Sequence, residues 1–152
     1  MTNLKLHILV AAVILFVTAP VFSDQANIKA ATDYDVQVAV AVASKAWKDA
    51  FNAGDAAAAA ELYEDDAIMV VKPFGTFKGK EEILAFWTDI INKGFDDVVY
   101  FNTTTIVLDH QSAQISADWR MNNARGVITN ETWVIQPNGK ALLHEDHFEI
   151  LQ

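Results

Sequence analysis

Apolar residues recur at helical spacing in the first half of the chain. Over residues 36–53 they form one stripe, made of Val36, Val40, Ala43, Trp47, Ala50 and Phe51. The alternating valines at the start of this segment also fit a strand. The segment is too long for one strand, however, and Gly54 stands where a helix commonly ends in glycine. The pattern therefore favours a helix.

The spacing of apolar residues and the capping residues predict two further helices and five strands. Asp55 and the alanine run after it predict a short helix over residues 56–63. Residues 67–71 predict a short apolar strand, stopped by the Lys72-Pro73-Phe74-Gly75 turn. A third helix begins near Lys80 and ends at Gly94. The period then changes to two, which predicts strands over residues 98–108, 113–122, 126–136 and 141–150. Helices followed by a strand meander indicate an α+β fold.

The first 23 residues differ from the rest of the chain. Lys5 precedes an apolar run over residues 6–17, and Ser23 offers a small residue at the end, as in a secretory signal peptide. Cleavage is expected at Ser23, with Ala26 as the alternative. The run is short for a membrane span, which needs about 20 residues, although an uncleaved anchor remains the competing interpretation.

We accordingly expect a signal peptide over residues 1–23, a linker over 24–35 and one domain over 36–152. The mature protein would be periplasmic or secreted and outside the membrane.

The composition excludes several kinds of site and partner. The 152 residues contain no cysteine, which excludes disulfides, thiolate metal sites and cysteine nucleophiles. The formal charge of −9 argues against a nucleic-acid partner, which would need a basic surface.

The order of motifs between Trp47 and Ile83 resembles a known family. A helix leads into Asn52-Ala53-Gly54-Asp55, a short helix into Leu62-Tyr63-Glu64-Asp65-Asp66-Ala67, and a strand into Phe77-Lys78-Gly79-Lys80. This order resembles the SnoaL-like and ketosteroid-isomerase-like families of the nuclear-transport-factor-2-like superfamily. The resemblance implies a cone of three N-terminal helices packed on a curved, mainly antiparallel sheet that encloses a pocket.

The ketosteroid-isomerase branch uses three positions, and this chain keeps one of them. The helix tyrosine of that branch falls on Trp47, and its proton-shuttling carboxylate falls on Val71 or Lys72. Its second acid, which holds the oxyanion, falls on Glu131. The resemblance therefore does not imply steroid isomerisation by that mechanism.

Strand alternation predicts which side chains form the candidate site. It places Glu131 on the same face as Trp133, where apolar surroundings raise the pKa of an acid and suit it to acid/base work; the competing interpretation is a solvent-facing glutamate. On the last strand it places His144 and Asp146 on the more apolar face, unless a bulge brings His147 inward instead. We expect Glu131, His144 and Asp146 to act catalytically at a cavity. Its expected substrate-binding walls are Trp47, Met69, Phe86, Trp87, Trp119 and Trp133.

Two functions remain open at this level. One is a cofactor-free enzyme of isomerase, cyclase or lyase type acting on a small hydrophobic molecule. The other is a non-catalytic ligand-binding or dimerisation module. No metal is expected, because His144 and His147 fall on opposite faces of one strand. A homodimer is expected through the outer sheet face, with polar contacts from Asn102, Thr104, Gln114 and Arg120.

Overall fold

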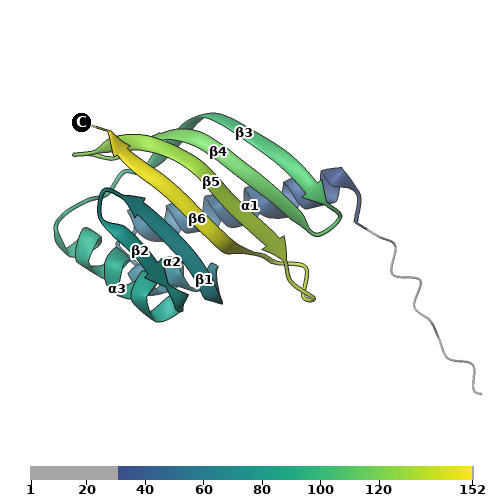
Figure 1. Ribbon diagram of the computed structural model, residues 1–152, viewed down its shortest axis with the longest axis horizontal. Helices are drawn as coiled ribbons and strands as arrows, with labels where there is room; N and C mark the ends of the chain where they lie inside the picture. Colours follow the sequence, from purple (N-terminus) through teal and green to yellow (C-terminus); the bar gives the residue numbers. More distant parts are fainter. Residues whose placement is uncertain (1–30, 152) are drawn as a thin grey trace, which may run out of the picture.

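A computed structural model describes residues 31–151, in which three helices pack against one face of a six-stranded sheet (Figure 1). The expected signal peptide, its cleavage point and most of the expected linker lie outside these residues. The elements in chain order are α1 (Asp33–Asn52), α2 (Ala56–Ala60), β1 (Tyr63–Lys72), β2 (Gly75–Lys78), α3 (Gly79–Asn92), β3 (Val99–Asp109), β4 (Ser112–Arg120), β5 (Arg125–Ile135) and β6 (Ala141–Leu151).

The sheet has the order β2-β1-β6-β5-β4-β3. The first strand lies parallel to the last, and every other neighbouring pair is antiparallel. As Figure 1 shows, α1 crosses behind the meander of β3 to β6, while α3 lies behind β1 and β2. The predicted α+β class and the arrangement of N-terminal helices on a curved, mainly antiparallel sheet are confirmed.

The largest differences from the predicted elements are at the start of the first helix, at the junction of α2 with β1, and at β2. The helix α1 begins at Asp33 because Thr32 and Asp35 form a capping box, in which Asp35 N donates to Thr32 Oγ1 at 3.3 Å and Thr32 N donates to Asp35 Oδ2 at 2.9 Å. The helix α2 stops at Ala60, and β1 already begins at Tyr63, whose side chain is fully buried. The four-residue strand β2 was not predicted, because so short a segment shows no clear alternation.

The interior lies between α1, α3 and the concave side of the sheet. Val36, Val40 and Phe51 from the predicted stripe of α1 are fully buried there. Ile83 and Trp87 contribute the buried face of α3. No helix within residues 31–151 is long and apolar enough to cross a membrane.

The motif Asn52-Ala53-Gly54-Asp55 joins three elements. Asn52 Nδ2 donates to the carbonyl of Val98 at 3.0 Å, and Val98 N donates to Asn52 Oδ1 at 2.7 Å, so one amide fixes the end of α1 to the segment before β3. Gly54 follows the helix end with a φ of 75°, which a residue with a side chain rarely adopts. Asp55 Oδ1 then accepts from Ala58 N at 2.8 Å and caps α2. The motif is therefore a structural junction.

Replacing Asn52 by Ala should lower the free energy of unfolding by about 1–3 kcal/mol, because two hydrogen bonds are lost. Urea unfolding followed by circular dichroism measures this change. Asn92→Ala is the matched control, since Asn92 is exposed at the end of α3, and it should stay within about 0.5 kcal/mol of the original protein. Equal stability of the two variants would contradict the role given to Asn52.

Candidate active site

Two acidic side chains face each other in the interior. Glu131 on β5 and Asp146 on β6 are directly paired across the antiparallel strands. They are 3% and 4% exposed, and of the described residues they are the only buried ones with an acidic side chain. Side chains at paired positions on one face of a sheet lie close together. The charge of one carboxyl group therefore affects the ionisation of the other.

Both oxygens of Glu131 accept hydrogen bonds. Tyr100 Oη donates to Oε1 at 2.9 Å, and Trp133 Nε1 donates to Oε2 at 3.1 Å. The ammonium group of Lys48, on α1, lies 4.3 Å from the centroid of the Tyr100 ring. A positive charge at that distance interacts favourably with the ring face. All of these groups favour the ionised form of Glu131.

Asp146 lies at the end of a short chain of donors. Trp87 Nε1, on α3, donates to Tyr63 Oη at 3.2 Å, and Tyr63 Oη donates to Asp146 Oδ2 at 2.6 Å. The proton of a neutral Asp146 would therefore occupy the other oxygen, Oδ1.

Burial raises the pKa of both acids. For Glu131 the hydrogen bonds from Trp133 and Tyr100 and the charge of Lys48 oppose this rise. For Asp146 the neighbouring charge of Glu131 adds to burial, and the hydrogen bond from Tyr63 opposes both, so its pKa is raised well above the ordinary value. Burial thus favours the neutral form of both acids, and more strongly for Asp146, so that Glu131 is the first of the two to ionise.

A cavity of about 20 Å³ adjoins the two acids. It offers room for about one water molecule. Its walls are Trp47, Trp87, Val98, Tyr100, Trp119, Met121, Ile128, Glu131, Asp146 and Phe148. We call this space the inner cavity.

Two tryptophans of this wall carry buried N–H groups without a hydrogen-bond partner among the described residues, namely Trp47 Nε1 and Trp119 Nε1. Trp119 lies directly against Gly126 of β5. A Cβ atom on Gly126 would come within 2.6 Å of the Trp119 ring and 1.9 Å of the carbonyl oxygen of Glu149. Only glycine at position 126 leaves space for the indole.

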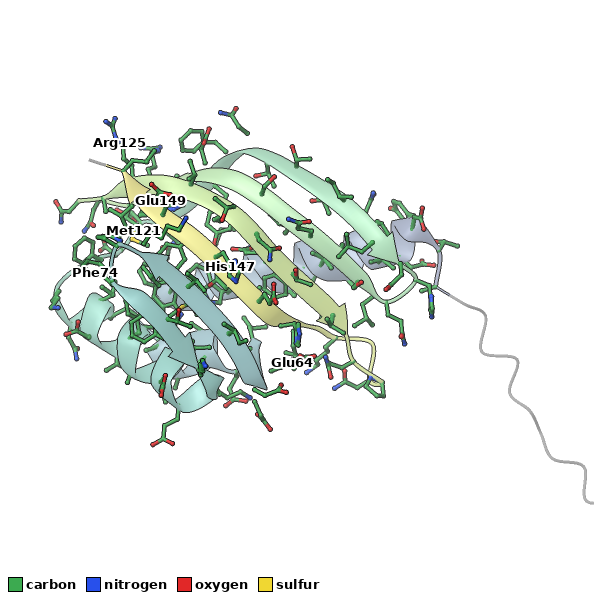
Figure 2. All side chains as sticks on the ribbon, in the orientation of Figure 1. Glu64, Phe74, Met121, Arg125, His147 and Glu149 are labelled. Carbon is green, nitrogen blue, oxygen red and sulfur yellow. The ribbon has the colours of Figure 1, made fainter. Side chains whose placement is uncertain are left out.

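A larger cavity of about 360 Å³ lies beside the inner one, toward the β1–β2 turn. We call it the outer cavity. Trp87, Trp119, Met121 and Phe148 line both spaces and separate them. The walls found only in the outer cavity are Phe74, Phe86, Ile90, Lys93, Phe95, Asn123, Ala124 and Ile150. Figure 2 shows Phe74 and Met121 at the same end of the molecule.

The structure distributes the six predicted wall residues over three places. Trp47, Trp87 and Trp119 line the inner cavity, and Phe86 lines the outer one. Met69 and Trp133 are buried but line neither cavity. Met69 is paired with Asp146 across β1 and β6, and Trp133 is held by Glu131.

The predicted position of His144 is wrong. The strand register places one extra residue in β6 at His144, and this bulge turns its side chain out of the interior. The side chain is 49% exposed, with Nδ1 2.7 Å from Glu64 Oε2. The bulge does not bring His147 inward either, since Asp146 and Phe148 take the buried positions. The structure therefore joins Glu131 to Asp146 and leaves His144 out.

His144 instead belongs to a surface group with Glu64 and Asp66, whose ligand-type atoms lie within 4.8 Å of one another. Glu64 is also held by Gln136, whose Nε2 donates to Oε1 at 2.6 Å. Of the described residues, this group has the composition and spacing to hold a divalent cation. Glu64 and Phe74 mark opposite ends of β1 in Figure 2, so the surface group lies away from the outer cavity.

Comparison with known proteins identifies the family. The family model of the SnoaL-like domain matches residues 45–141. The chain belongs to the SnoaL-like domain family. A comparison with curated proteins gave no match.

Solved structures agree on the fold of this SnoaL-like domain. A ketosteroid isomerase-like protein from Erwinia carotovora atroseptica superposes with a TM-score of 0.67 at 15% identity, covering 80% of this chain and 99% of that one. A nuclear-transport-factor-2-like protein with a cystatin-like fold from Novosphingobium aromaticivorans has a TM-score of 0.65 at 16% identity, covering 78% and 84%. At these identities the likeness establishes the fold alone.

Sequence reasoning missed three contributors to the site. Tyr63 stands next to the acids of the family motif, and its place at the start of a strand was hidden by the alanine run before it. Alternation along β3 turns Tyr100 inward, and this signal could have identified it. Lys48 carries no signal in the sequence, because a lysine on a helix is ordinarily solvated.

The raised pKa values make the stability of this domain pH-dependent. The folded state holds protons on Glu131 and Asp146 that the unfolded state has released above about pH 4. The free energy of unfolding should therefore fall as pH rises from about 5 to about 8, by about 1.4 kcal/mol for each unit of pKa shift.

Asp146→Asn should make this fall smaller, because the amide keeps the shape of the carboxyl and cannot lose a proton. Urea unfolding at both pH values measures the difference. Asp96→Asn on the exposed surface is the control and should keep the original pH dependence. An unchanged slope in Asp146→Asn would contradict the assignment.

Proposed function

We propose that this SnoaL-like domain binds a small, mainly apolar molecule in the outer cavity and catalyses a proton transfer on it without a cofactor. The reaction type would be isomerisation, cyclisation or elimination. The observation that carries the proposal is the pair of buried acids, Glu131 and Asp146, at the inner cavity. On the N-terminal pattern described above, the protein acts after export to the periplasm or exterior.

The pair supplies a base and an acid at one place. Glu131 receives hydrogen bonds from Tyr100 and Trp133 and remains the proton acceptor. Asp146, beside that charge, keeps its proton and remains the donor. In an isomerisation the carboxylate takes a proton from one carbon of the ligand, and a proton returned to another carbon restores the charge balance. Two acids with pKa values held apart are the usual basis for such a division.

The outer cavity would hold the apolar body of the ligand. Its volume of about 360 Å³ falls in the range of small-molecule sites, and its walls are largely aromatic and aliphatic. The ligand reaches the acids when the side chains between the two cavities move. Met121 is the most adaptable of these, because it is unbranched and only half-buried.

One observation favours a second function, namely binding without catalysis. The inner cavity takes about one water molecule, so a ligand held only in the outer cavity would never touch Glu131. The acids would then be a polar part of the core. Native mass spectrometry of the purified protein identifies a retained ligand under either function, and a catalytic test separates the two.

Glu131→Gln should abolish proton transfer while preserving binding. The probe is 1-tetralone, a bicyclic ketone, whose hydrogens next to the carbonyl exchange with deuterium from D₂O when a base removes them. The original protein should accelerate this exchange over buffer, and the variant should lose about 100-fold or more of the acceleration. Proton NMR follows the exchange, and tryptophan fluorescence follows binding.

The control for Glu131→Gln is Glu81→Gln, the same change on the exposed first turn of α3. Exchange that is equally fast in Glu131→Gln would rule out Glu131 as the base. Binding of the ketone without any acceleration would favour the second function.

We also propose a homodimer through the outer face of the sheet. The edge strand β3 exposes a row of large apolar side chains there, at 39–55% of their surface: Val99, Phe101, Ile106 and Leu108. Exposed apolar groups of this kind mark interaction surfaces. Polar partners for the interface are Asn102, Thr104, Gln114 and Arg120, of which Gln114 is paired with Ile106 across the strands.

Light scattering at tens of micromolar, roughly the range that reveals weak interfaces, should give the mass of two chains. Ile106→Glu places a charge on the outer face and should give the mass of one. Tyr34→Glu, on an exposed side chain of α1, is the control and should leave the dimer intact. A single-chain mass for the original protein would contradict the dimer.

A further inference from the structure

The surface group of Glu64, Asp66 and His144 brings two strands together outside the interior. Its ligand-type atoms lie within 4.8 Å of one another. His144 Nδ1, on β6, is 2.7 Å from Glu64 Oε2, on β1, although 80 positions separate the two residues in the chain. The side chains of His144 and Glu64 are 49% and 19% exposed, so solvent reaches the group.

Two irregularities of the sheet meet at this group. The pairing of β1 with β6 is interrupted between Tyr63 and Ile68. The residues inside the interruption lie opposite His144, which has no paired residue in β5 either. Bulges of this kind redirect side chains and are frequent next to functional sites. In this sheet they turn one imidazole toward two carboxylates.

The acids of the run Glu64-Asp65-Asp66 have different surroundings. Asp65 Oδ1 lies 3.0 Å from the ammonium group of Lys80. Within residues 31–151, neither Glu64 nor Asp66 has a lysine or arginine partner. Glu64 Oε1 instead accepts a neutral hydrogen bond, from Gln136 Nε2 at 2.6 Å. Two carboxylates close together repel each other, and a cation bound between them removes that repulsion.

The ligand atoms indicate the class of cation. One imidazole nitrogen with carboxylate oxygens suits zinc and similar transition metals, whereas magnesium and calcium take oxygen ligands. Ligands about 2.0–2.2 Å from a tetrahedral zinc ion lie about 3.4 Å from one another. The distance from His144 Nδ1 to Glu64 Oε2 would therefore widen slightly, and the exposed Asp66 would approach. Gln136 holds the other oxygen of Glu64 and leaves Oε2 for the ion.

We propose that Glu64, Asp66 and His144 bind a zinc ion that fastens β1 to β6. The expectation of no metal concerned His144 together with His147, whereas this site uses one histidine and two carboxylates. Water completes the coordination on the exposed side. The unfolded chain does not hold these three residues together, so a bound ion stabilises the folded domain. The site lies away from the outer cavity, and the proposed function does not depend on it.

Titration calorimetry with zinc chloride tests the site, on the protein without a histidine tag and freed of metal by a chelator. We expect one zinc ion per chain. Gln136→Ala should weaken binding by about 10-fold, because Glu64 loses the hydrogen bond that orients it. Asp66→Asn and His144→Ala remove ligands and should weaken binding at least as much.

Two controls match these variants. Asp65→Asn is the same change as Asp66→Asn in the adjacent acid, which pairs with Lys80. His147→Ala removes a histidine from the same strand as His144. Both control variants should bind zinc as tightly as the original protein.

Thermal unfolding gives a second measurement. Saturating zinc should raise the Tm of the original protein, leave that of His144→Ala unchanged, and lose its effect when EDTA is added. Calcium chloride is the matched salt, because attraction to a chain with a formal charge of −9 would act on both ions. The imidazole ligand should make zinc bind about 10-fold or more tightly than calcium.

Three outcomes would overturn the zinc site. They are no zinc binding, equal binding of zinc and calcium, and weaker binding in His147→Ala or Asp65→Asn than in Asp66→Asn. The comparison of Asp66→Asn with Asp65→Asn decides the question even where His144→Ala does not fold, since both acids are exposed. Deuterium exchange of 1-tetralone tests the proposed function separately, and neither result alters the other.

Discussion

Two carboxyl groups buried side by side set the conditions for the rest of this interior. Two ionised carboxylates in such a place would repel each other with little water between them, and each would also lose its hydration. Glu131 and Asp146 meet this constraint by unequal surroundings. Glu131 receives two hydrogen bonds and lies near a lysine, whereas Asp146 receives one short hydrogen bond from Tyr63 and lies beside a negative charge. The difference between the two environments allows the pair to exist.

The fold supplies these surroundings from strands on either flank of the acid pair and from the helices that cover the same face of the sheet. The parallel pairing of β1 with β6 brings Tyr63 to Asp146, although 83 positions separate them in the chain. The meander brings Tyr100 of β3 to Glu131 across β4. The helices above the sheet add Lys48 from α1 and Trp87 from α3. The acid pair is thus a product of the tertiary fold, and no single segment of the chain contains it.

Periodicity in the sequence predicted the helices, the meander and the burial of Glu131 and Asp146. It gave wrong side-chain directions where one strand has an extra residue relative to its neighbour. The bulge in β6 shifts the alternation at His144. A second irregularity in β5, between Ile128 and Asn130, leaves Thr129 exposed, whereas strict alternation would put it on the face of Glu131. Such bulges depend on the register with the neighbouring strand, which the pattern of one strand does not contain. Hydrogen bonds between residues far apart in the chain, such as those of Tyr63 and Tyr100, could not be predicted either, because they depend on how the strands are placed relative to one another.

The glycine at position 126 is required by the sheet as well as by the cavity wall. A Cβ atom there would meet the carbonyl oxygen of Glu149 on β6 at 1.9 Å, in addition to the ring of Trp119. A smaller residue at position 119 would therefore not make room for a side chain at 126, because the backbone of β6 would still obstruct it. Trp119, in contrast, is a wall of both cavities, and its size can change without any change in the sheet. Among related sequences, the shape of the cavities should therefore vary through position 119, while position 126 stays glycine.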